Sequence, residues 1–336
     1  MQKLSEKTTK MLLSTEVEIF DQLITPDHPF RRLKQVINWE EIIDPLRNLY
    51  SDLGRSGFSI EKTFKALLVQ FWEDYSDRQM EKAVKENIAI KWFCGFGLTE
   101  ETPNYSYFSR LRKRIGTNKL ANVFNAVNKQ LELKGLFGNV FTFVDASAII
   151  TKTALWEERD QAIKNGEEKL NNAVVKKYAA DKDARWGAKS KNKIWFGYKR
   201  HCAVDMRHGL INKVAVTPAN VLDFKMTENI CPKQGMVFCD KLYDCKQANQ
   251  AIIGNNCFLG TLRKNRNPLK NKDLDKWRSA IRMPFEGTFS KLRKRSKFRG
   301  LTKMTFQCFA EAIVHNLKKA TTVIPACAGR PIITTQ

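Results

Sequence analysis

The chain has 336 residues, of which 43% are hydrophobic, and its formal net charge is +23. This length predicts two domains with a sizeable core, and so large an excess of positive charge indicates a polyanionic partner rather than an acidic one. No apolar run approaches the roughly 20 residues that a membrane-spanning helix needs, and the start MQKLSEKTTK lacks the apolar stretch of a secretory signal. We therefore expect a cytosolic protein without a membrane partner.

The eight cysteines include no C-x-x-C pair, and the four histidines complete no zinc pattern. Reduced thiols and no zinc site are expected.

The first 138 residues have the apolar spacing of helices. Four residues recur at i, i+3, i+4 and i+7 and indicate one buried helix face: Phe64, Leu67, Leu68 and Phe71. Ser76 followed by Asp77 is a good N-cap, which predicts a further helix through Val84. A turn at Gly135–Gly138 ends this region, so residues 1–138 are expected to form an all-helical N-terminal domain.

A basic helix is predicted from Tyr105 to Ile115. Its inward stripe is apolar and consists of Phe108, Leu111 and Ile115. Its outward side chains are basic: Arg110, Lys113 and Arg114. This arrangement is typical of the second helix of a helix-turn-helix module, whose outer face enters a DNA major groove. A solvated helix of a structural bundle is the alternative.

After residue 138 the pattern becomes α/β. Strands are predicted at 140–144 and 236–239, and an antiparallel hairpin at 194–205 and 210–216. Helices are expected at 220–230, 244–253 and 303–319, with a further strand at 257–262. A polar insertion occupies about 152–193, with a helical part around 157–175, and the tail at 323–336 is expected to be frayed.

Three carboxylates stand out in this region. Asp145 and Asp240 each follow an apolar strand, where ligands gather in open α/β sheets, although a strand-end aspartate also serves as a cap for the next element. Glu286 lies in a basic segment, Arg263–Lys303, that holds fifteen Lys or Arg against three acids. Three carboxylates suit a pair of Mg²⁺ ions, which cut phosphodiesters without a covalent intermediate.

The position of Glu286 depends on where its helix begins. Proline is tolerated in the first turn of a helix, so a start near Pro284 would place Glu286 close to the helix N-terminus. Phe289 and Arg293 then follow on the same face as Glu286, with Phe289 packed against the sheet and Arg293 near a phosphate.

A strand with Asp, a hairpin, a helix, a strand with Asp and a helix with Glu follow one another in the order of an RNase H-like domain. The chain resembles DDE-type insertion-sequence transposases of the insertion-sequence-five branch from about Phe30 to Lys319. The N-terminal motifs are RRLKQVINWEEI, FKALLVQFWEDYSDRQMEKAV and WFCGFGLTEETPNYSYFSRLRKR. The later ones are DKDARWGAKSKNKIWFGYKRHCAVD, VTPANVLDF, FCDKLYD and RMPFEGTFSKLR. The expected fold is an RNase H-like mixed sheet flanked by helices (139–322), preceded by the helical DNA-binding domain.

The resemblance implies that Asp145, Asp240 and Glu286 bind two Mg²⁺ ions, which Mn²⁺ can replace. It implies that Arg282 contacts phosphate, and the basic residues around it are further DNA-binding candidates: Lys291, Arg293 and Lys294. The implied partners are double-stranded DNA, as terminal inverted repeats and target, and a second copy of the chain in a synaptic complex at the bacterial nucleoid. The implied reaction is strand cleavage followed by attack of the freed 3′-hydroxyl on target DNA.

Three positions depart from the family motifs. Ser279 stands where tyrosine is expected, Arg293 where lysine is expected, and Leu242 where glycine is frequent. An inactive or domesticated DNA-binding protein is therefore one alternative function, and a nuclease of the same fold without strand transfer is another.

Four further residues have smaller assignments. His201 and Asp205 lie in the strand motif GYKRHCAVD and are candidates to line the active cleft, although a lone strand histidine is more often structural. Trp186 and Trp195 flank a basic loop and would stack on an unpaired base or, more commonly, pack in the fold.

Overall fold

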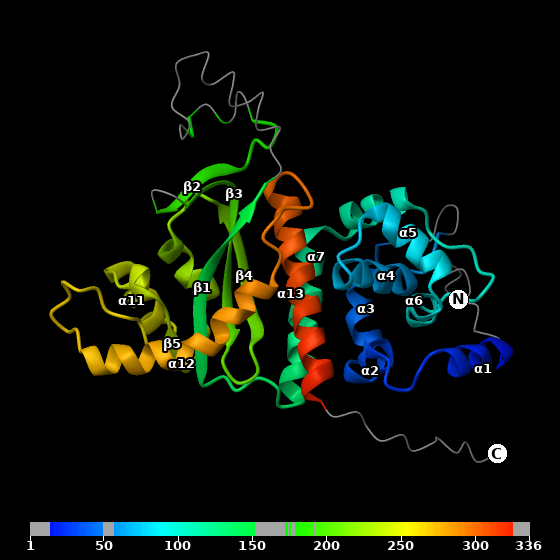
Figure 1. Cartoon of the computed structure of the whole chain (residues 1–336), viewed down its shortest axis with the longest axis horizontal. Helices are drawn as coiled ribbons and strands as arrows, with labels where there is room; N and C mark the ends of the chain where they lie inside the picture. The colour runs from blue at the N-terminus through cyan, green and yellow to red at the C-terminus, as the bar shows by residue number, and fades with distance from the viewer. Residues whose placement is uncertain are drawn as a thin grey trace. The chain divides into compact units, whose positions relative to one another are not determined.

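The computed structural model describes residues 14–49, 57–151, 172–173, 175, 179–190 and 193–324. The chain divides into two compact units, one made of Met1–Lys134 with Asn316–Gln336 and the other of Gly135–His315 (Figure 1). The border lies at Lys134, four residues before the position expected from sequence, and the last part of the closing helix belongs with the first unit.

The first unit is helical. Its helices are α1 (Ser14–Leu23), α2 (Pro29–Val36), α3 (Trp39–Arg47), α4 (Ile60–Trp72), α5 (Asp77–Glu86), α6 (Ile88–Cys94) and α7 (Tyr105–Leu133). The apolar face predicted around Phe64 is buried on α4, and every other residue from Ile60 to Phe71 except Glu61 is buried as well. The cap predicted at Ser76 is confirmed, because Ser76 and Gln79 form a reciprocal capping box at the start of α5.

The basic helix predicted at Tyr105–Ile115 is the first part of α7. Its inward stripe is buried: Phe108, Leu111 and Ile115. The helix does not stop at Ile115, because a kink at Gly116 (φ 66°, ψ 173°) is followed by further helical turns to Leu133. A positive φ of this kind is readily adopted only by glycine, so Gly116 redirects the helix without ending it.

The second unit is built on a mixed sheet. Its strands are β1 (Phe141–Ile150), β2 (Arg185–Ser190), β3 (Lys193–Asp205), β4 (Leu210–Pro218), β5 (Met236–Phe238) and β6 (Phe258–Leu259). They lie in the order β2-β3-β1-β5-β6, with β4 also paired to β3. Strands β1 to β4 pair antiparallel, whereas β1, β5 and β6 are parallel neighbours. The hairpin predicted at 194–205 and 210–216 is confirmed as β3 and β4.

Strand β1 is longer than its apolar run predicts. It continues six residues past Val144 because β3 pairs with it as far as Ile150 opposite Gly197. Gly197 is required there, since a Cβ would lie 2.1 Å from the carbonyl oxygen of Ile149. Strand β2 was not predicted, because it falls within the polar insertion and takes its conformation from β3. The helix expected around 157–175 falls mainly outside the described residues, as does most of the tail after 323.

Helices cover both faces of this sheet. They are α10 (Thr227–Ile230), α11 (Lys246–Gly254), α12 (Lys272–Lys291) and α13 (Leu301–Val323), with 3-10 turns η1 (Asp223–Met226) and η2 (Lys241–Tyr243). One core joins Val144 of β1 to residues of α10 and α11, and another joins Ile149 of β1 to Met304 and Cys308 of α13. The expected fold class, a mixed α/β sheet flanked by helices and preceded by a helical region, is confirmed. The single helix expected at 220–230 is instead divided into η1 and α10.

The start of α12 corrects the prediction for Glu286. The helix begins at Lys272 rather than near Pro284, and Asn271 caps it by accepting hydrogen bonds from the backbone N–H groups of Asp273 and Leu274. Pro284 lies inside the helix, and α12 ends at Lys291. Glu286 is therefore near the C-terminal end, and Arg293 lies beyond the helix and does not share its face.

Among the described helices, none is both long enough and apolar enough to cross a membrane.

Candidate active site

Asp145 and Asp240 lie at the same level of two neighbouring parallel strands. Phe143 of β1 is paired with Phe238 of β5, and each aspartate stands two residues further along its own chain. Neighbouring strands are about 4.8 Å apart, so this register brings the two carboxylates to adjacent positions. The expectation of a strand end is right for Asp240, which follows β5, and wrong for Asp145, which lies within β1. Asp145 nevertheless lies where the neighbouring strand stops, because β5 ends at Phe238, which pairs with Phe143.

Each aspartate also binds a nearby backbone N–H group. Asp145 accepts a hydrogen bond from Ala146 (2.8 Å), and Asp240 caps η2 by accepting one from Leu242 (2.8 Å). The capping interpretation of Asp240 is thus confirmed, and among the described residues no hydrogen bond to its second carboxylate oxygen is found.

The two carboxylates oppose each other's ionisation. Burial, assisted by the negative charges of Asp240 and Asp223, raises the pKa of Asp145 from 3.8 to about 6. Burial also raises the pKa of Asp240, while Arg282 and Lys189 act in the opposite direction. Two acids held close together in a partly buried site are stabilised in their charged form by a cation between them.

The helix that carries Glu286 packs near this site. Arg282 and Phe289, four residues before and three after it, both contact the ring of Phe143 on β1: Arg282 Cζ lies 5.6 Å from the ring centroid, and the two phenylalanine rings are 5.5 Å apart. Residues at these spacings share one helix face, so Glu286 belongs to the face that packs on β1 near Asp145. The predicted packing of Phe289 against the sheet is confirmed.

The carboxylate of Glu286 is bound to an arginine. Arg282 Nη2 lies 3.2 Å from Glu286 Oε1, and the Glu286 side chain is 52% exposed. Arg282 itself is largely buried, and its Nε atom has no hydrogen-bond partner among the described residues. A buried guanidinium with an unused donor beside Asp240 is suited to receive a phosphate oxygen.

Two charged residues that sequence reasoning did not assign act on the pair. Asp223, at the start of η1, disfavours ionisation of both Asp145 and Asp240, and Lys189 of β2 favours it. Asp223 is held by Lys199 Nζ at 2.7 Å, and the same ammonium donates to the carbonyl oxygen of Val221 at 2.9 Å. Both unassigned residues lie within quoted family motifs, VTPANVLDF and DKDARWGAKSKNKIWFGYKR, which was the available signal.

The basic residues after α12 lie beside the end of β1. Ile150 N donates to the carbonyl oxygen of Lys294 (2.8 Å), and Ser296 N donates to the carbonyl oxygen of Ile150 (2.9 Å). Lys291, the last residue of α12, and Lys294 on this segment are exposed. Arg293 Nε donates to the carbonyl oxygen of Arg295 (3.1 Å). The backbone of this basic segment is therefore fixed beside the C-terminal end of β1.

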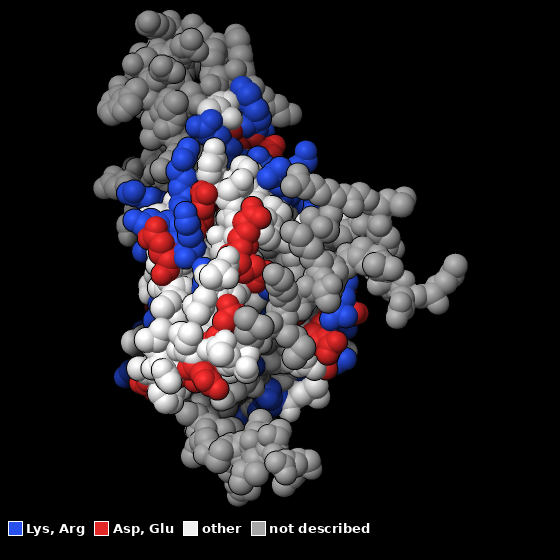
Figure 2. All heavy atoms as spheres, turned by 90° about the vertical axis from the view of Figure 1, so that its right-hand side faces the viewer, with Lys and Arg blue, Asp and Glu red and all other residues white. Residues whose placement is uncertain are grey.

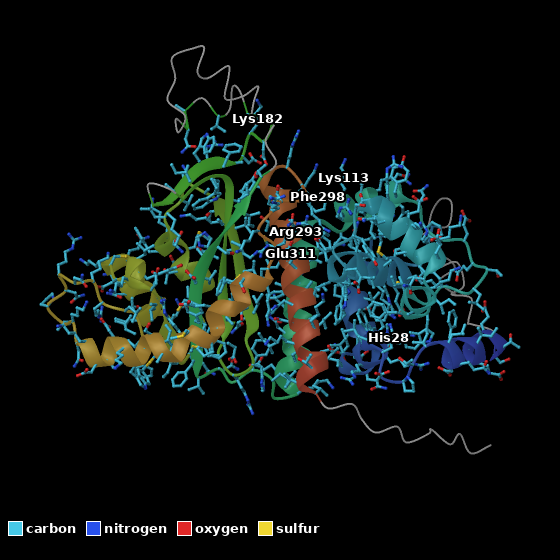
Figure 3. The ribbon with its side chains drawn as sticks, viewed as in Figure 1. His28, Lys113, Lys182, Arg293, Phe298 and Glu311 are labelled. Atoms are coloured by element: carbon cyan, nitrogen blue, oxygen red, sulfur yellow. The ribbon has the colours of Figure 1, made fainter. Side chains whose placement is uncertain are left out.

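A buried ion pair contacts the backbone of the basic segment that follows α12. Arg200 of β3 pairs with Glu311 of α13 and donates to the carbonyl oxygen of Arg293 (3.4 Å). Arg293 and Glu311 are labelled close together in Figure 3. Because both partners of the ion pair are buried, we assign the pair a structural role in holding the segment.

His201 and Asp205 do not line an open cleft, contrary to the expectation from sequence. His201 is fully buried, its Nε2 lies 2.8 Å from Thr217 Oγ1, and burial lowers its pKa to about 4. The Asp205 carboxylate is also buried and accepts hydrogen bonds from the backbone N–H groups of Gly138, Asn139 and Arg207. These contacts use both side chains to fix the hairpin and the entry to β1.

The two tryptophans pack within the fold, as the commoner alternative predicted. Trp186 lies 5.3 Å from Phe196, measured between ring centroids, and packs against the core that contains Ile149. Trp195 Nε1 donates to the carbonyl oxygen of Tyr198 (3.2 Å).

In the first unit, Arg110, Lys113 and Arg114 are exposed on α7; Lys113 is labelled in Figure 3. Arg112, between them, joins α7 to α5 through its ion pair with Asp77 (2.6 Å). On the face shown in Figure 2, Lys and Arg side chains are interspersed with Asp and Glu. The positive excess of the chain is therefore not one unbroken patch on that face.

The donor set suits Mg²⁺ in kind, since Asp145, Asp240 and Glu286 offer only oxygen ligands. Among the residues that the structure describes, no group of three or more His, Cys, Asp or Glu side chains is already arranged to hold a metal ion. Asp145 and Asp240 lie at neighbouring positions, whereas the carboxylate of Glu286 is paired with Arg282.

Two family models match the chain. One, described as Transposase DDE domain, matches residues 137–317, which is more than half of the chain. The other, described as Transposase domain (DUF772), matches residues 18–114. No solved structure matches.

Proposed function

Because this chain belongs to the transposase DDE domain family, we propose that it cuts DNA at the ends of an insertion sequence and joins the freed 3′-hydroxyl to target DNA. The observation that carries this proposal is the paired register of Asp145 and Asp240 on β1 and β5. Within the family we propose the insertion-sequence-five branch, which the motifs quoted above resemble.

In this proposal Asp145, Asp240 and Glu286 would hold two Mg²⁺ ions, with Glu286 no longer paired with Arg282. When bound, two Mg²⁺ ions activate the attacking oxygen and stabilise the leaving one, and Mn²⁺ serves in their place. Arg282, released from Glu286, binds a phosphate oxygen next to Asp240. Lys291, Arg293 and Lys294 extend this phosphate contact along the edge of the sheet.

The first unit supplies the recognition of DNA. Arg110, Lys113 and Arg114 project from α7 in the manner of a helix that reads the major groove, which would select the terminal inverted repeats. Two copies of the chain pair two element ends in a synaptic complex, and the reaction takes place at the nucleoid in the bacterial cytoplasm. Residues 1–138 serve as the DNA-binding domain and residues 139–322 as the catalytic domain.

The test compares wild-type protein with Asp145→Asn on a supercoiled plasmid that carries the inverted repeats found in the DNA flanking the gene. Wild type should cleave the repeat ends with Mg²⁺ or Mn²⁺ and join them to a second plasmid. Asp145→Asn should bind the same DNA without cutting it. Asp273→Asn, at an exposed aspartate in the first turn of α12, is the matched control and should retain cleavage.

The other outcomes identify the alternatives. Specific binding of the repeats by wild type without cleavage would indicate a DNA-binding protein that has lost its activity. Cleavage without joined products would indicate a nuclease that lacks strand transfer. Full cleavage by Asp145→Asn would remove Asp145 from the catalytic set.

A further inference from the structure

The loop between β6 and α12 carries an exposed leucine. Leu269 is 75% exposed, and it lies in a segment with five Lys or Arg and no acid between residues 263 and 272. The loop leads into α12 at the left of Figure 1. Single exposed leucines are common on protein surfaces and need no explanation by themselves. Leu269 differs from them because hydrogen bonds order the loop that carries it.

One buried carboxylate anchors the loop. Asp244 accepts hydrogen bonds from Arg263 Nη1 (2.8 Å), from the backbone N–H of Lys264 (2.8 Å) and from Asn267 Nδ2 (2.9 Å). Lys264 Nζ also donates to the carbonyl oxygen of Asp244 (2.9 Å). Lys270 Nζ in turn donates to Asn265 Oδ1 (2.6 Å), which leaves its other two N–H donors for a ligand. Three of the cations therefore have partners in or beside the loop, and the loop is fixed to the segment that follows Asp240.

Asn267 connects the anchored base of the loop to the tip that carries Leu269. Asn267 donates to Asp244 with its amide nitrogen and accepts, with its amide oxygen, a hydrogen bond from the backbone N–H of Leu269 (2.9 Å). Lys270 N donates to the carbonyl oxygen of Asn267 (3.1 Å), and Pro268 restricts the backbone between them. Leu269 is thus displayed on an ordered support, which lowers the entropy lost when it binds something.

The base of the loop is tied to the helix of the candidate site. Arg278 Nη1 donates to the carbonyl oxygen of Thr261 (3.1 Å) at the start of the loop. Arg278 stands one helical turn before Arg282, and Asp244 stands four residues after Asp240. The loop is therefore bonded to both segments that carry the candidate carboxylates. Asp244 joins it to the segment of Asp240, and Arg278 joins it to α12, which carries Glu286.

We propose that this loop is a DNA wedge, in which Leu269 inserts between base pairs beside the cleaved bond while Arg266 and Lys270 bind the flanking phosphates. Proteins that kink DNA insert apolar side chains between base steps in this way. The charge of the loop favours DNA over a second copy of the chain, because residues 263–272 include no acid. The inference rests on the proposed function, since it assumes that DNA lies at the site.

The probe is a duplex with a single nick and a 2-aminopurine base next to the nick, together with its unbroken counterpart. Since a wedge does not depend on base sequence, any sequence serves. Wild type should raise the 2-aminopurine fluorescence, which reports unstacking, and should prefer the nicked duplex. Leu269→Ala should lose the fluorescence rise and the preference for the nick, yet still bind the unbroken duplex as wild type does. Leu133→Ala, at a leucine with 79% exposure in α7, is the matched control and should behave as wild type.

Two further variants test the supporting parts. Asn267→Ala keeps Leu269 but breaks its tether, so it should reduce the fluorescence rise. Arg266→Ala should lower the slope of log affinity against log salt concentration by about 0.9, as expected for one lost phosphate contact.

Each failure has its own meaning. An unchanged fluorescence rise in Leu269→Ala, with DNA binding intact, would overturn the wedge and leave the proposed function standing. A change in self-association of Leu269→Ala in sedimentation, with unaltered fluorescence, would overturn it in favour of contact between copies of the chain. Wild type that binds neither this probe nor the terminal repeats would instead contradict the proposed function.

Discussion

Replacing Asp145 with asparagine should stabilise the metal-free protein at neutral pH, even though we expect it to abolish DNA cleavage. Burial and the neighbouring acids raise the pKa of Asp145 from 3.8 to about 6, which means that the folded state holds the proton more tightly than the unfolded state does. The charged form is thus destabilising in the fold. Asparagine has no such charge, and its amide oxygen can still accept the hydrogen bond from the Ala146 N–H group.

The size of the effect follows from the pKa. A rise from 3.8 to about 6 costs about 3 kcal/mol once the pH is well above 6, and under about 1 kcal/mol at pH 4. The destabilisation is therefore absent at low pH, grows as the pH passes from 4 to 6, and is complete above that. For a unit of this size, about 3 kcal/mol corresponds to a rise in melting temperature of about 6–12 °C.

The assay is thermal unfolding followed by circular dichroism in EDTA, at a series of pH values from 4 to 8, for wild type, Asp145→Asn and the control Asp273→Asn. Asp145→Asn should melt above wild type at pH 8, and the gap should close toward pH 4. Added Mg²⁺ should raise the melting temperature of wild type more than that of Asp145→Asn, because a bound ion stabilises only the state that binds it. A gap that is independent of pH, or a variant that melts below wild type at pH 8, would refute the electrostatic reasoning.

Three other substitutions have definite expected results. Asp205→Ala leaves three backbone N–H groups without their acceptor and should lower the free energy of unfolding by about 3 kcal/mol or more, measured by urea denaturation, while Asp205→Asn should lose less; an Ala variant as stable as wild type would contradict the anchoring role. Ser76→Ala removes the cap of α5 and should cost about 1 kcal/mol in the same assay, whereas Ser76→Asp should restore stability. The double variant Arg110→Ala, Arg114→Ala should reduce discrimination between terminal repeat and scrambled duplex by about 1–3 kcal/mol in fluorescence titrations at several salt concentrations. Full retention of that preference would place end selection elsewhere in the chain.

Local signals in the sequence predicted much of the fold. The apolar face of α4, the cap at Ser76 and the hairpin of β3 and β4 were predictable because each depends on residues that are close to one another in the sequence. The two aspartates were also predicted as site residues from their own strands, because an acid directly after an apolar run is poorly suited to a core.

The tertiary structure decided what depends on residues far apart in the chain. Strand β1 extends past Asp145 because β3 pairs with it, and Asp205 is buried because backbone N–H groups from residues 138 and 139 reach its carboxylate. The start of α12, by contrast, has a local signal that the prediction missed, because Asn271 caps the N–H groups of Asp273 and Leu274 and the helix begins twelve residues before Pro284.

For the candidate site, too, the sequence and the tertiary structure supplied different information. Its residue types could be predicted from sequence, because carboxylates, arginines and lysines are the groups that bind metal ions and phosphates. Their partners could not be predicted: Asp223 acts on Asp145 from 78 residues away, and Lys199 holds Asp223 across 24 residues. Charge interactions act through space, whereas a sequence pattern records only neighbours along the chain, so only the folded sheet showed which charges meet.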